Sequence, residues 1–192
     1  MPFKIGIAGS AEGDFEKILD KAQQVGRILG KKGAIVITGA SNGLPYEVAK
    51  VARKNGAEIW GYSKGTDLKS QEATNPELDS NIFTKLIYIP KDFEFANDPK
   101  VCMKYRNVIW TANCDGAILI SGRWGTLNEF TNLFDMGKVI GVLTGTGGVA
   151  DELENLSKKI NKPSKAKIIF NSSPKALINS ILKELSLRRK QA

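Results

Sequence analysis

The residues best suited to chemistry lie between positions 115 and 130. An apolar run from Gly116 to Ile120 breaks into the turn Ser121–Thr126, and an amphipathic stretch from Leu127 to Met136 follows directly. This pattern predicts a strand, a glycine-containing turn and a helix. Such a turn exposes backbone N–H groups and the positive end of a helix dipole at the carboxyl edge of a sheet, where phosphates bind. The candidate phosphate-binding residues of this turn are Gly122, Arg123, Gly125 and Thr126.

Glu129 stands one turn into the predicted helix, and the sequence allows it two roles. A carboxylate placed over a ribose could stabilise an oxocarbenium-like centre or position a water molecule, as carboxylates do in glycoside hydrolysis. The spacing from Thr126 to Glu129 also matches a capping box, in which the glutamate reaches back to the N–H of the cap residue. The sequence alone leaves both roles open.

Two further glycine turns follow predicted strands. They contribute Gly9 and Ser10 after residues 3–8, and Gly39 and Gly43 after residues 34–38. Because the carboxyl ends of parallel strands meet at one sheet edge, we expect the three turns to form one crevice for a phosphate or nucleotide. None of the turns matches the dinucleotide fingerprint or the phosphate loop of ATPases, so nicotinamide redox chemistry and ATP hydrolysis are disfavoured.

Two arginines could act at this crevice. Arg106 lies inside a helix predicted over residues 99–113, where it is either functional or an ordinary surface or ion-pair residue. Trp110, one turn further on, is either a core residue or a platform for a base. Arg123 lies inside the turn itself, where it could clamp a phosphate through two hydrogen bonds or block the site.

The elements that must position these residues alternate strand and helix along the chain. We predict strands at 3–8, 34–38, 57–62, 85–89, 116–120, 139–143 and 166–171, and helices at 14–31, 45–54, 99–113, 127–136, 149–160 and 174–187. Continuous apolar strands indicate burial on both faces. The expected class is therefore α/β, a doubly wound parallel sheet of about seven strands with helices on both faces. Its ligand should sit at the carboxyl edge where the strand order reverses.

Three other expectations concern the organisation of the chain. We predict a single nucleotide-binding domain over residues 1–187, followed by a frayed basic tail at 188–192. Asp14 is the expected cap of the first helix. Residues 63–83 are polar and rich in turn signals, and we interpret them as a loop that forms a flap near the crevice.

Composition excludes several classes of site. The chain has no histidine, which removes histidine-dependent nucleophiles and histidine-ligated metals, so we expect no metal and no cofactor. Cys102 and Cys114 are the only cysteines, and we expect them to be reduced core residues. With no long apolar run and no leader-like segment, we expect a cytoplasmic protein without membrane contact.

The net charge of +8 is unevenly distributed. Residues 156–192 hold ten Lys and Arg against one acidic residue, Glu184. This end is either a solvated basic surface or a region that attracts an anionic partner such as nucleic acid. The expected principal partner is a small nucleotide ligand bound in the crevice.

Residues 3 to about 150 resemble the LONELY GUY family of cytokinin nucleoside 5′-monophosphate phosphoribohydrolases, whose wider group is often mislabelled lysine decarboxylase. Gly9-Ser10 and Gly39–Leu44 resemble its first two glycine turns. Met103–Arg106 resembles its Met-x-x-Arg-Lys motif, with Asn107 in place of the lysine. Ser121–Glu129 resembles its Pro-Gly-Gly-x-Gly-Thr-x-x-Glu motif.

The resemblance implies a Rossmann-like fold, a homodimer or higher homo-oligomer, and a catalytic pair formed by Arg106 and Glu129. It also implies that Gly125 and Thr126 hold a 5′-phosphate. The wider group includes molybdenum cofactor carrier proteins, and the DNA-processing protein A family has a similar fold. Ser121, Arg123, Asn107 and Pro45 depart from the family pattern. Hydrolysis of a nucleoside 5′-monophosphate is the first hypothesis, a non-catalytic nucleotide or pterin carrier the second, and nucleic-acid association through residues 156–192 the third.

Overall fold

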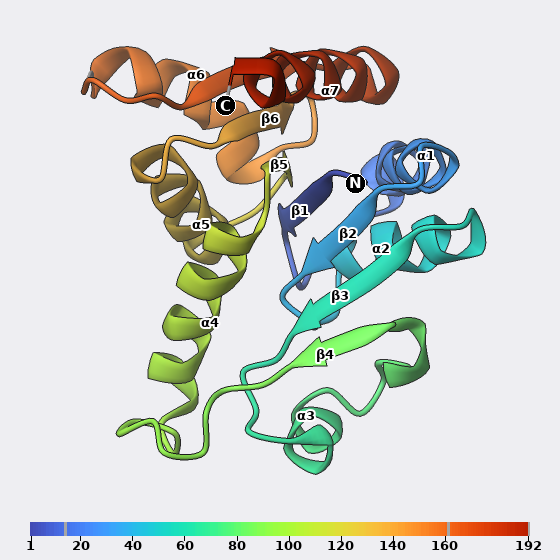
Figure 1. The fold of residues 1–192 in the computed structure, drawn as a ribbon, viewed down its shortest axis with the longest axis vertical. Helices are drawn as coiled ribbons and strands as arrows, with labels where there is room; N and C mark the ends of the chain where they lie inside the picture. Colours follow the sequence, from blue (N-terminus) through green and yellow to red (C-terminus); the bar gives the residue numbers. More distant parts are fainter. Residues whose placement is uncertain (14, 161, 192) are drawn as a thin grey trace.

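A seven-stranded parallel sheet forms the centre of the computed structural model, which describes residues 1–13, 15–160 and 162–191. The strand order is β4-β3-β2-β1-β5-β6-β7, and Figure 1 shows the strands between two groups of helices. The strands are β1 (Lys4–Gly9), β2 (Ile35–Thr38), β3 (Glu58–Tyr62), β4 (Lys85–Ile87), β5 (Gly116–Ile120), β6 (Val139–Leu143) and β7 (Lys167–Asn171). The predicted doubly wound α/β class is therefore confirmed.

The strand order reverses at β1. The chain winds outward from β1 to β4, then returns to place β5 on the other side of β1 and continues to β7. Strand β1 pairs with β2 through Gly6↔Ile37 and with β5 through Gly9↔Ile120. The loops after β1 and β5 therefore diverge from a shared edge, which is the topological switch point where ligands of this fold class bind.

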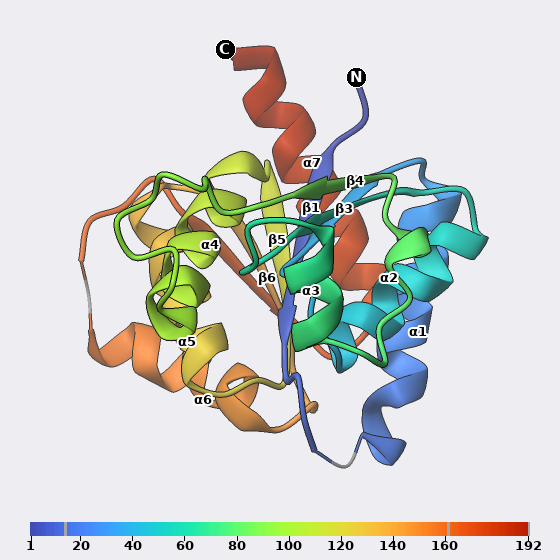
Figure 2. The same ribbon diagram turned by 90° about the horizontal axis from the view of Figure 1, so that it is seen from below.

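Three helices cover each face of the sheet. Helices α1 (Glu16–Lys31), α2 (Leu44–Lys54) and α7 (Pro174–Gln191) pack on one face, and α4 (Pro99–Asn113), α5 (Trp124–Asp135) and α6 (Gly148–Lys159) pack on the other. Figure 1 shows α1 and α2 on the side of the sheet opposite to α4 and α5, and Figure 2 shows the same division from below. Each crossover thus buries one apolar stripe against the sheet.

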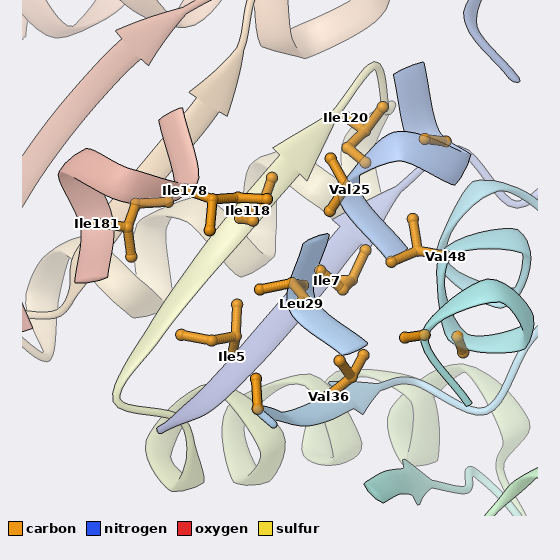
Figure 3. Packing of buried hydrophobic residues seen from close by; sticks show 14 of the residues in the cluster. Ile5, Ile7, Val25, Leu29, Val36, Val48, Ile118, Ile120, Ile178 and Ile181 are labelled. Atoms are coloured by element: carbon orange, nitrogen blue, oxygen red, sulfur yellow. The ribbon is translucent and has the colours of Figure 1, made fainter. Parts of the chain in front are cut away.

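Alternation along the central strands supplies both cores. Ile118 and Ile120 point toward α1, α2 and α7, whereas Leu119 points toward α4, α5 and α6. Figure 3 shows the first core, where Ile7 and Ile118 lie among side chains of α1, α2 and α7 such as Val25. Burying an isoleucine or leucine side chain completely stabilises the folded state by about 1.5–3 kcal/mol relative to leaving it exposed to water. These buried strands therefore hold the edge of the sheet rigidly.

The segment 63–83, which we interpreted as a loop that forms a flap near the crevice, is more ordered than a loop. It contains the short helix α3 (Leu68–Thr74) and the 3-10 turn η1 (Ser80–Ile82). Asp67 caps α3 in a capping box with Ser70. The buried Gln71 side chain donates to the Ala40 carbonyl at 2.8 Å, and the Tyr46 hydroxyl accepts from Asp79 N at 2.8 Å. These hydrogen bonds between residues far apart in the sequence hold the segment against the second glycine turn and the start of α2.

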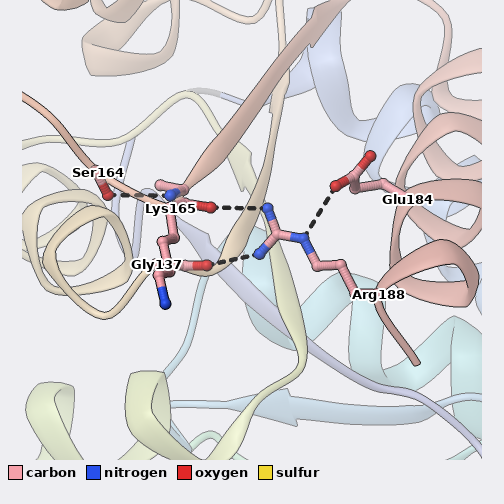
Figure 4. Close-up of polar contacts among 6 residues, drawn as sticks. Gly137, Ser164, Lys165, Glu184 and Arg188 are labelled. Carbon is pink, nitrogen blue, oxygen red and sulfur yellow. Dashed lines mark hydrogen bonds and ion pairs between the residues drawn. The ribbon is translucent and has the colours of Figure 1, made fainter. Parts of the chain in front are cut away.

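The last helix extends further than predicted, because α7 continues through Gln191 and includes the basic residues that we expected in a frayed tail. Arg188 anchors this end: its guanidinium donates to the Gly137 carbonyl at 2.7 Å, the Lys165 carbonyl at 2.8 Å and the Glu184 carboxylate at 2.9 Å (Figure 4). Arg189 donates to the Met1 carbonyl at 2.7 Å, and Figure 2 shows the start of the chain and the end of α7 on the same side of the molecule. The frayed-tail prediction failed because sequence cannot show these distant acceptors.

Much of the basic charge lies at helix C-termini. Helices α1, α2, α6 and α7 all carry Lys or Arg in the last turn, where a cation complements the helix dipole. In a parallel α/β sheet those ends gather at the amino edge, opposite the switch point. Five of the ten Lys and Arg residues of segment 156–192 lie in such last turns and therefore have a structural role even without an anionic partner.

Several smaller predictions can be compared with the structure. Cys102 and Cys114 are free and buried, as predicted. Asp14, the expected cap of the first helix, lies outside the described residues. None of the described helices combines the length and apolar character needed to span a membrane.

Replacing Arg188 by Ala should lower the free energy of unfolding by about 1–2 kcal/mol, because two backbone carbonyls lose a charged donor. Urea denaturation followed by circular dichroism measures this change. Lys190→Ala is the control, since Lys190 is exposed and its side chain makes no hydrogen bond or ion pair with the described residues. Equal stability of the two variants would show that Arg188 does not anchor α7.

Candidate active site

A cavity of about 670 Å³ opens at the carboxyl edge of the sheet, at the switch point. The predicted site residues among its lining are Gly9, Ser10, Gly39, Arg106, Arg123, Gly125, Thr126 and Glu129. Segment 63–83 adds Lys64, Thr74, Asn75 and Glu77. The crevice expected from the three glycine turns therefore exists, although Gly43 and Gly122 do not line it.

Glu129 projects from α5 into this cavity and is only 9% exposed. Helix α5 begins at Trp124, three residues before the predicted start, and its cap position is Arg123. Thr126 therefore lies inside the first turn and cannot be the cap residue of a box with Glu129. Instead, Glu129 Oε1 accepts a hydrogen bond from Trp110 Nε1 at 3.3 Å. The helix-capping alternative is excluded.

Burial sets the protonation behaviour of Glu129. Desolvation raises the pKa of its carboxyl from 4.5 to about 7, while the nearby charge of Arg106 and the Trp110 hydrogen bond act to lower it. At neutral pH the carboxyl thus exchanges readily between its two forms. A carboxyl with a pKa near 7 inside a cleft is suited to general acid–base chemistry.

Arg106 is a buried cavity residue, not a surface arginine, at 8% exposure. It comes from α4, which starts at Pro99 behind the cap residue Asp98, whose carboxylate accepts from Lys100 N at 2.9 Å. The guanidinium donates to the Gly39 carbonyl. Burial lowers the pKa of Arg106 and the charge of Glu129 raises it, and an arginine remains protonated in this setting.

Gly39 is required by this arrangement. A Cβ built on Gly39 would lie 1.4 Å from Arg106 Nη1, so any side chain there displaces the guanidinium. Sequence reasoning placed Gly39 among the phosphate-binding residues. In the structure Gly39 lines the cavity, and its carbonyl holds the arginine at the cavity wall.

The loops after β1 and β5 are tied together at the switch point. Ser10 Oγ accepts from Gly122 N at 2.9 Å, and Ser121 N donates to Thr146 Oγ1 at 2.8 Å. Gly122 has a left-handed φ of 101°, and a Cβ there would lie 2.4 Å from the Thr126 side chain. Gly43, with φ of 87°, is the cap residue of α2 and packs against the Ser10 carbonyl. These residues give the cavity its shape.

The N-terminus of α5 is open toward the cavity. No side chain caps it, and its first intrahelical bond is Leu127 N to the Arg123 carbonyl at 3.0 Å. The N–H groups of Trp124, Gly125 and Thr126 therefore have no acceptor within the helix. A Cβ built on Gly125 would meet no atom within 4 Å. This open helix end, with its positive dipole, can bind an anion.

Two residues, Trp110 and Asn107, make contacts at the site that the sequence did not indicate. Trp110 is a core residue, which is one of its two predicted places, and its indole Nε1 also donates to Glu129 Oε1. Its spacing of four from Arg106 places both on one helix face, which is the signal that was available. Asn107, the departure from the family lysine, is buried and donates to Asn128 Oδ1 at 3.1 Å. It joins α4 to α5.

Within residues 1–13, 15–160 and 162–191, no three His, Cys, Asp or Glu side chains come close enough to hold a metal ion. Among the groups that line the cavity, those suited to chemistry are the carboxyl of Glu129, the guanidinium of Arg106 and the backbone N–H groups at the start of α5.

The fold and cavity define a Rossmann-like protein with a carboxyl and an arginine at the switch point. The profile of the SLOG cluster4 family matches residues 2–178, so the chain belongs to that family. This confirms the expected LONELY GUY-like Rossmann group. A search of curated proteins gave no match.

Solved structures share the fold at low identity. The protein TM1055 matches with a TM-score of 0.75 and 19% identity, over 96% of this chain and 99% of that one. The molybdenum cofactor binding protein of Rippkaea orientalis matches with a TM-score of 0.65 and 22% identity, over 95% and 98%. DNA processing protein A of Helicobacter pylori, described as binding single-stranded DNA, matches with a TM-score of 0.64 and 20% identity, over 95% and 81%.

Glu129→Gln should stabilise the protein increasingly as pH rises. The Glu129 carboxyl has a pKa of about 7 in the folded protein and 4.5 as its ordinary value in the unfolded chain. Because the folded state holds this proton more tightly, the stability of the wild type falls as pH rises from 4.5 to 7 and then levels off. The amide cannot ionise. The difference in unfolding free energy should therefore grow by up to about 3 kcal/mol between pH 4.5 and pH 8.

Urea unfolding at pH 4.5, 6 and 8 measures this growth. Glu154→Gln, an exposed position on α6, is the control and should show no such pH dependence. A constant difference between Glu129→Gln and the wild type across this range would mean that the Glu129 pKa is not raised.

Proposed function

We propose that this protein hydrolyses the N-glycosidic bond of a nucleoside 5′-monophosphate, releasing the free base and ribose 5-phosphate. One observation carries the proposal: the buried carboxyl of Glu129 faces the same cavity as the open N-terminus of its own helix. A helix rises about 1.5 Å per residue, so Gly125 and Glu129 lie about 6 Å apart along the axis. A phosphate at the helix end thus places its ribose beside the carboxyl.

The substrate binds through its phosphate. The free N–H groups of Gly125 and Thr126 donate to the phosphate oxygens, and the helix dipole favours their charge. This contact sets the position of the ribose and does not depend on which base is attached. The preference for a monophosphate over a nucleoside follows from it.

Ionised Glu129 then acts at C1′ of the ribose. As the electrons of the C1′–N bond move to the leaving base, positive charge develops on the sugar, and the carboxylate stabilises it. A water molecule attacks C1′ and its proton passes to Glu129, whose pKa of about 7 suits a base at neutral pH. The departing base takes a proton from solvent. Trp110 and Arg106 hold the carboxylate and its surroundings in place.

A second candidate function is a non-catalytic carrier of a nucleotide or pterin-type cofactor. Arg123 favours it, because it adds a cation at the cavity mouth where the LONELY GUY motif has a glycine. The likeness to a molybdenum cofactor binding protein supports the same idea at the level of fold. A ligand that stays bound through purification, without any base release, would favour this function over hydrolysis.

Base release from a panel of nucleoside 5′-monophosphates tests the first proposal. The wild type should release base from monophosphates but not from the matching nucleosides. Glu129→Gln should lower kcat by at least about a hundredfold, the scale of a lost general base, while still binding ligand. Glu154→Gln is the matched control and should be fully active. Equal turnover by Glu129→Gln and the wild type would refute the assignment of Glu129.

Gly39→Ala should lower kcat/KM by at least about tenfold, because the new methyl group displaces the Arg106 guanidinium from the cavity wall. Steady-state base release measures the loss. In an Arg106→Ala background the same change should have no further effect. An equal loss in both backgrounds would show that Gly39 acts independently of Arg106.

A further inference from the structure

An ion pair crosses the mouth of the cavity. Arg123 Nη2 lies 3.0 Å from Glu12 Oε2, and both residues line the cavity. Glu12 belongs to the loop after β1, whereas Arg123 is the cap residue of α5. The pair therefore joins the two loops of the switch point directly beside the open helix end.

This ion pair is easily exchanged. The side chains of Arg123 and Glu12 are 63% and 81% exposed, and exposed pairs contribute little to stability. The loops beneath them are held independently by the bond from Gly122 N to Ser10 Oγ. Arg123 and Glu12 can therefore separate without moving the backbone of either loop.

Arg123 also differs from the other arginine in the cavity. Arg106 is buried and donates to the Gly39 carbonyl, whereas the guanidinium of Arg123 bonds, among the described residues, only to Glu12. A guanidinium can grip a phosphate through two parallel hydrogen bonds, which are stronger than an exposed pair with a carboxylate. An anion at the α5 N-terminus would meet Arg123 as an available cation and Glu12 as a repelling charge.

We propose that Glu12 and the phosphate of the ligand compete for Arg123, which makes Arg123 a specificity-determining residue for phosphorylated ligands. Without ligand, Arg123 pairs with Glu12. A phosphate at the first turn of α5 takes Arg123 over, and the Glu12 carboxylate turns to solvent. This inference rests on the proposed phosphate site and refines which ligands it accepts: a doubly charged phosphate monoester outcompetes Glu12, and an unphosphorylated sugar does not.

Ribose 5-phosphate is the probe, because it carries the phosphate and sugar of every nucleoside 5′-monophosphate. Isothermal titration calorimetry should show that Arg123→Gln raises its Kd about tenfold, the scale of a lost charge-assisted contact. Glu12→Gln should lower the Kd about twofold to fivefold, because the competing carboxylate is gone. In the double variant, Glu12→Gln should add nothing to the effect of Arg123→Gln.

The control variant is Arg27→Gln, which removes another exposed ion pair, with Asp20, away from the cavity. It should leave the Kd unchanged, and unphosphorylated ribose should bind none of the variants measurably. Arg123→Lys keeps the positive charge but cannot form two parallel hydrogen bonds with a phosphate, so its Kd for ribose 5-phosphate should lie between those of the wild type and Arg123→Gln. Circular dichroism confirms that each variant is folded.

Three results would overturn the proposal. These are an unchanged Kd in Arg123→Gln, a gain from Glu12→Gln that persists when Arg123 is absent, and a wild type that does not bind ribose 5-phosphate at millimolar concentration. Base release is scored separately. A protein that shows this coupling but releases no base would refute hydrolysis and leave the competition for Arg123 standing.

Discussion

The structure of this site depends on one constraint, the burial of the Glu129 carboxyl. A carboxylate that is removed from water must gain hydrogen bonds or a nearby positive charge in place of its lost hydration, or else become neutral. Here these interactions replace only part of the lost hydration. Trp110 supplies a single hydrogen bond and Arg106 supplies charge, yet desolvation dominates and holds the pKa near 7. Arg106 in turn stays in place because Gly39 has no side chain and offers its carbonyl. The chemistry proposed for Glu129 follows from this balance.

The doubly wound sheet creates that environment. Reversal of strand order at β1 opens a crevice between the loops after β1 and β5, and the hydrogen bonds of Ser10 with Ser121 and Gly122 hold those two loops together. Helix α5 contributes both its open N-terminus and, one turn later, Glu129. A single rigid helix thus sets the distance between the proposed phosphate site and the proposed reacting centre, while exposed side chains at the mouth adjust to the ligand.

Local patterns predicted most of the fold. Helix α4 was predicted with its observed bounds because Asp98 and Pro99 begin it and a buried strand follows. The start of α5 was placed three residues too late, since Arg123 is not a usual cap residue and no side chain caps the helix. Segment 63–83 was predicted as a loop because the contact that anchors it, the hydrogen bond from Gln71 to the Ala40 carbonyl, joins residues far apart in the sequence and leaves no local pattern. The site followed the same rule: Arg106 and Glu129 were found, but the roles of Trp110 and Gly39 depend on contacts between distant residues.

The pH dependence of kcat/KM for base release tests the central claim most directly. If ionised Glu129 is the working group, kcat/KM should rise as pH increases, with a midpoint near the pKa of about 7, and then level off. Below that midpoint it should fall about tenfold per pH unit. A profile that stays flat from pH 5 to pH 8, or one that declines with rising pH, would contradict the account.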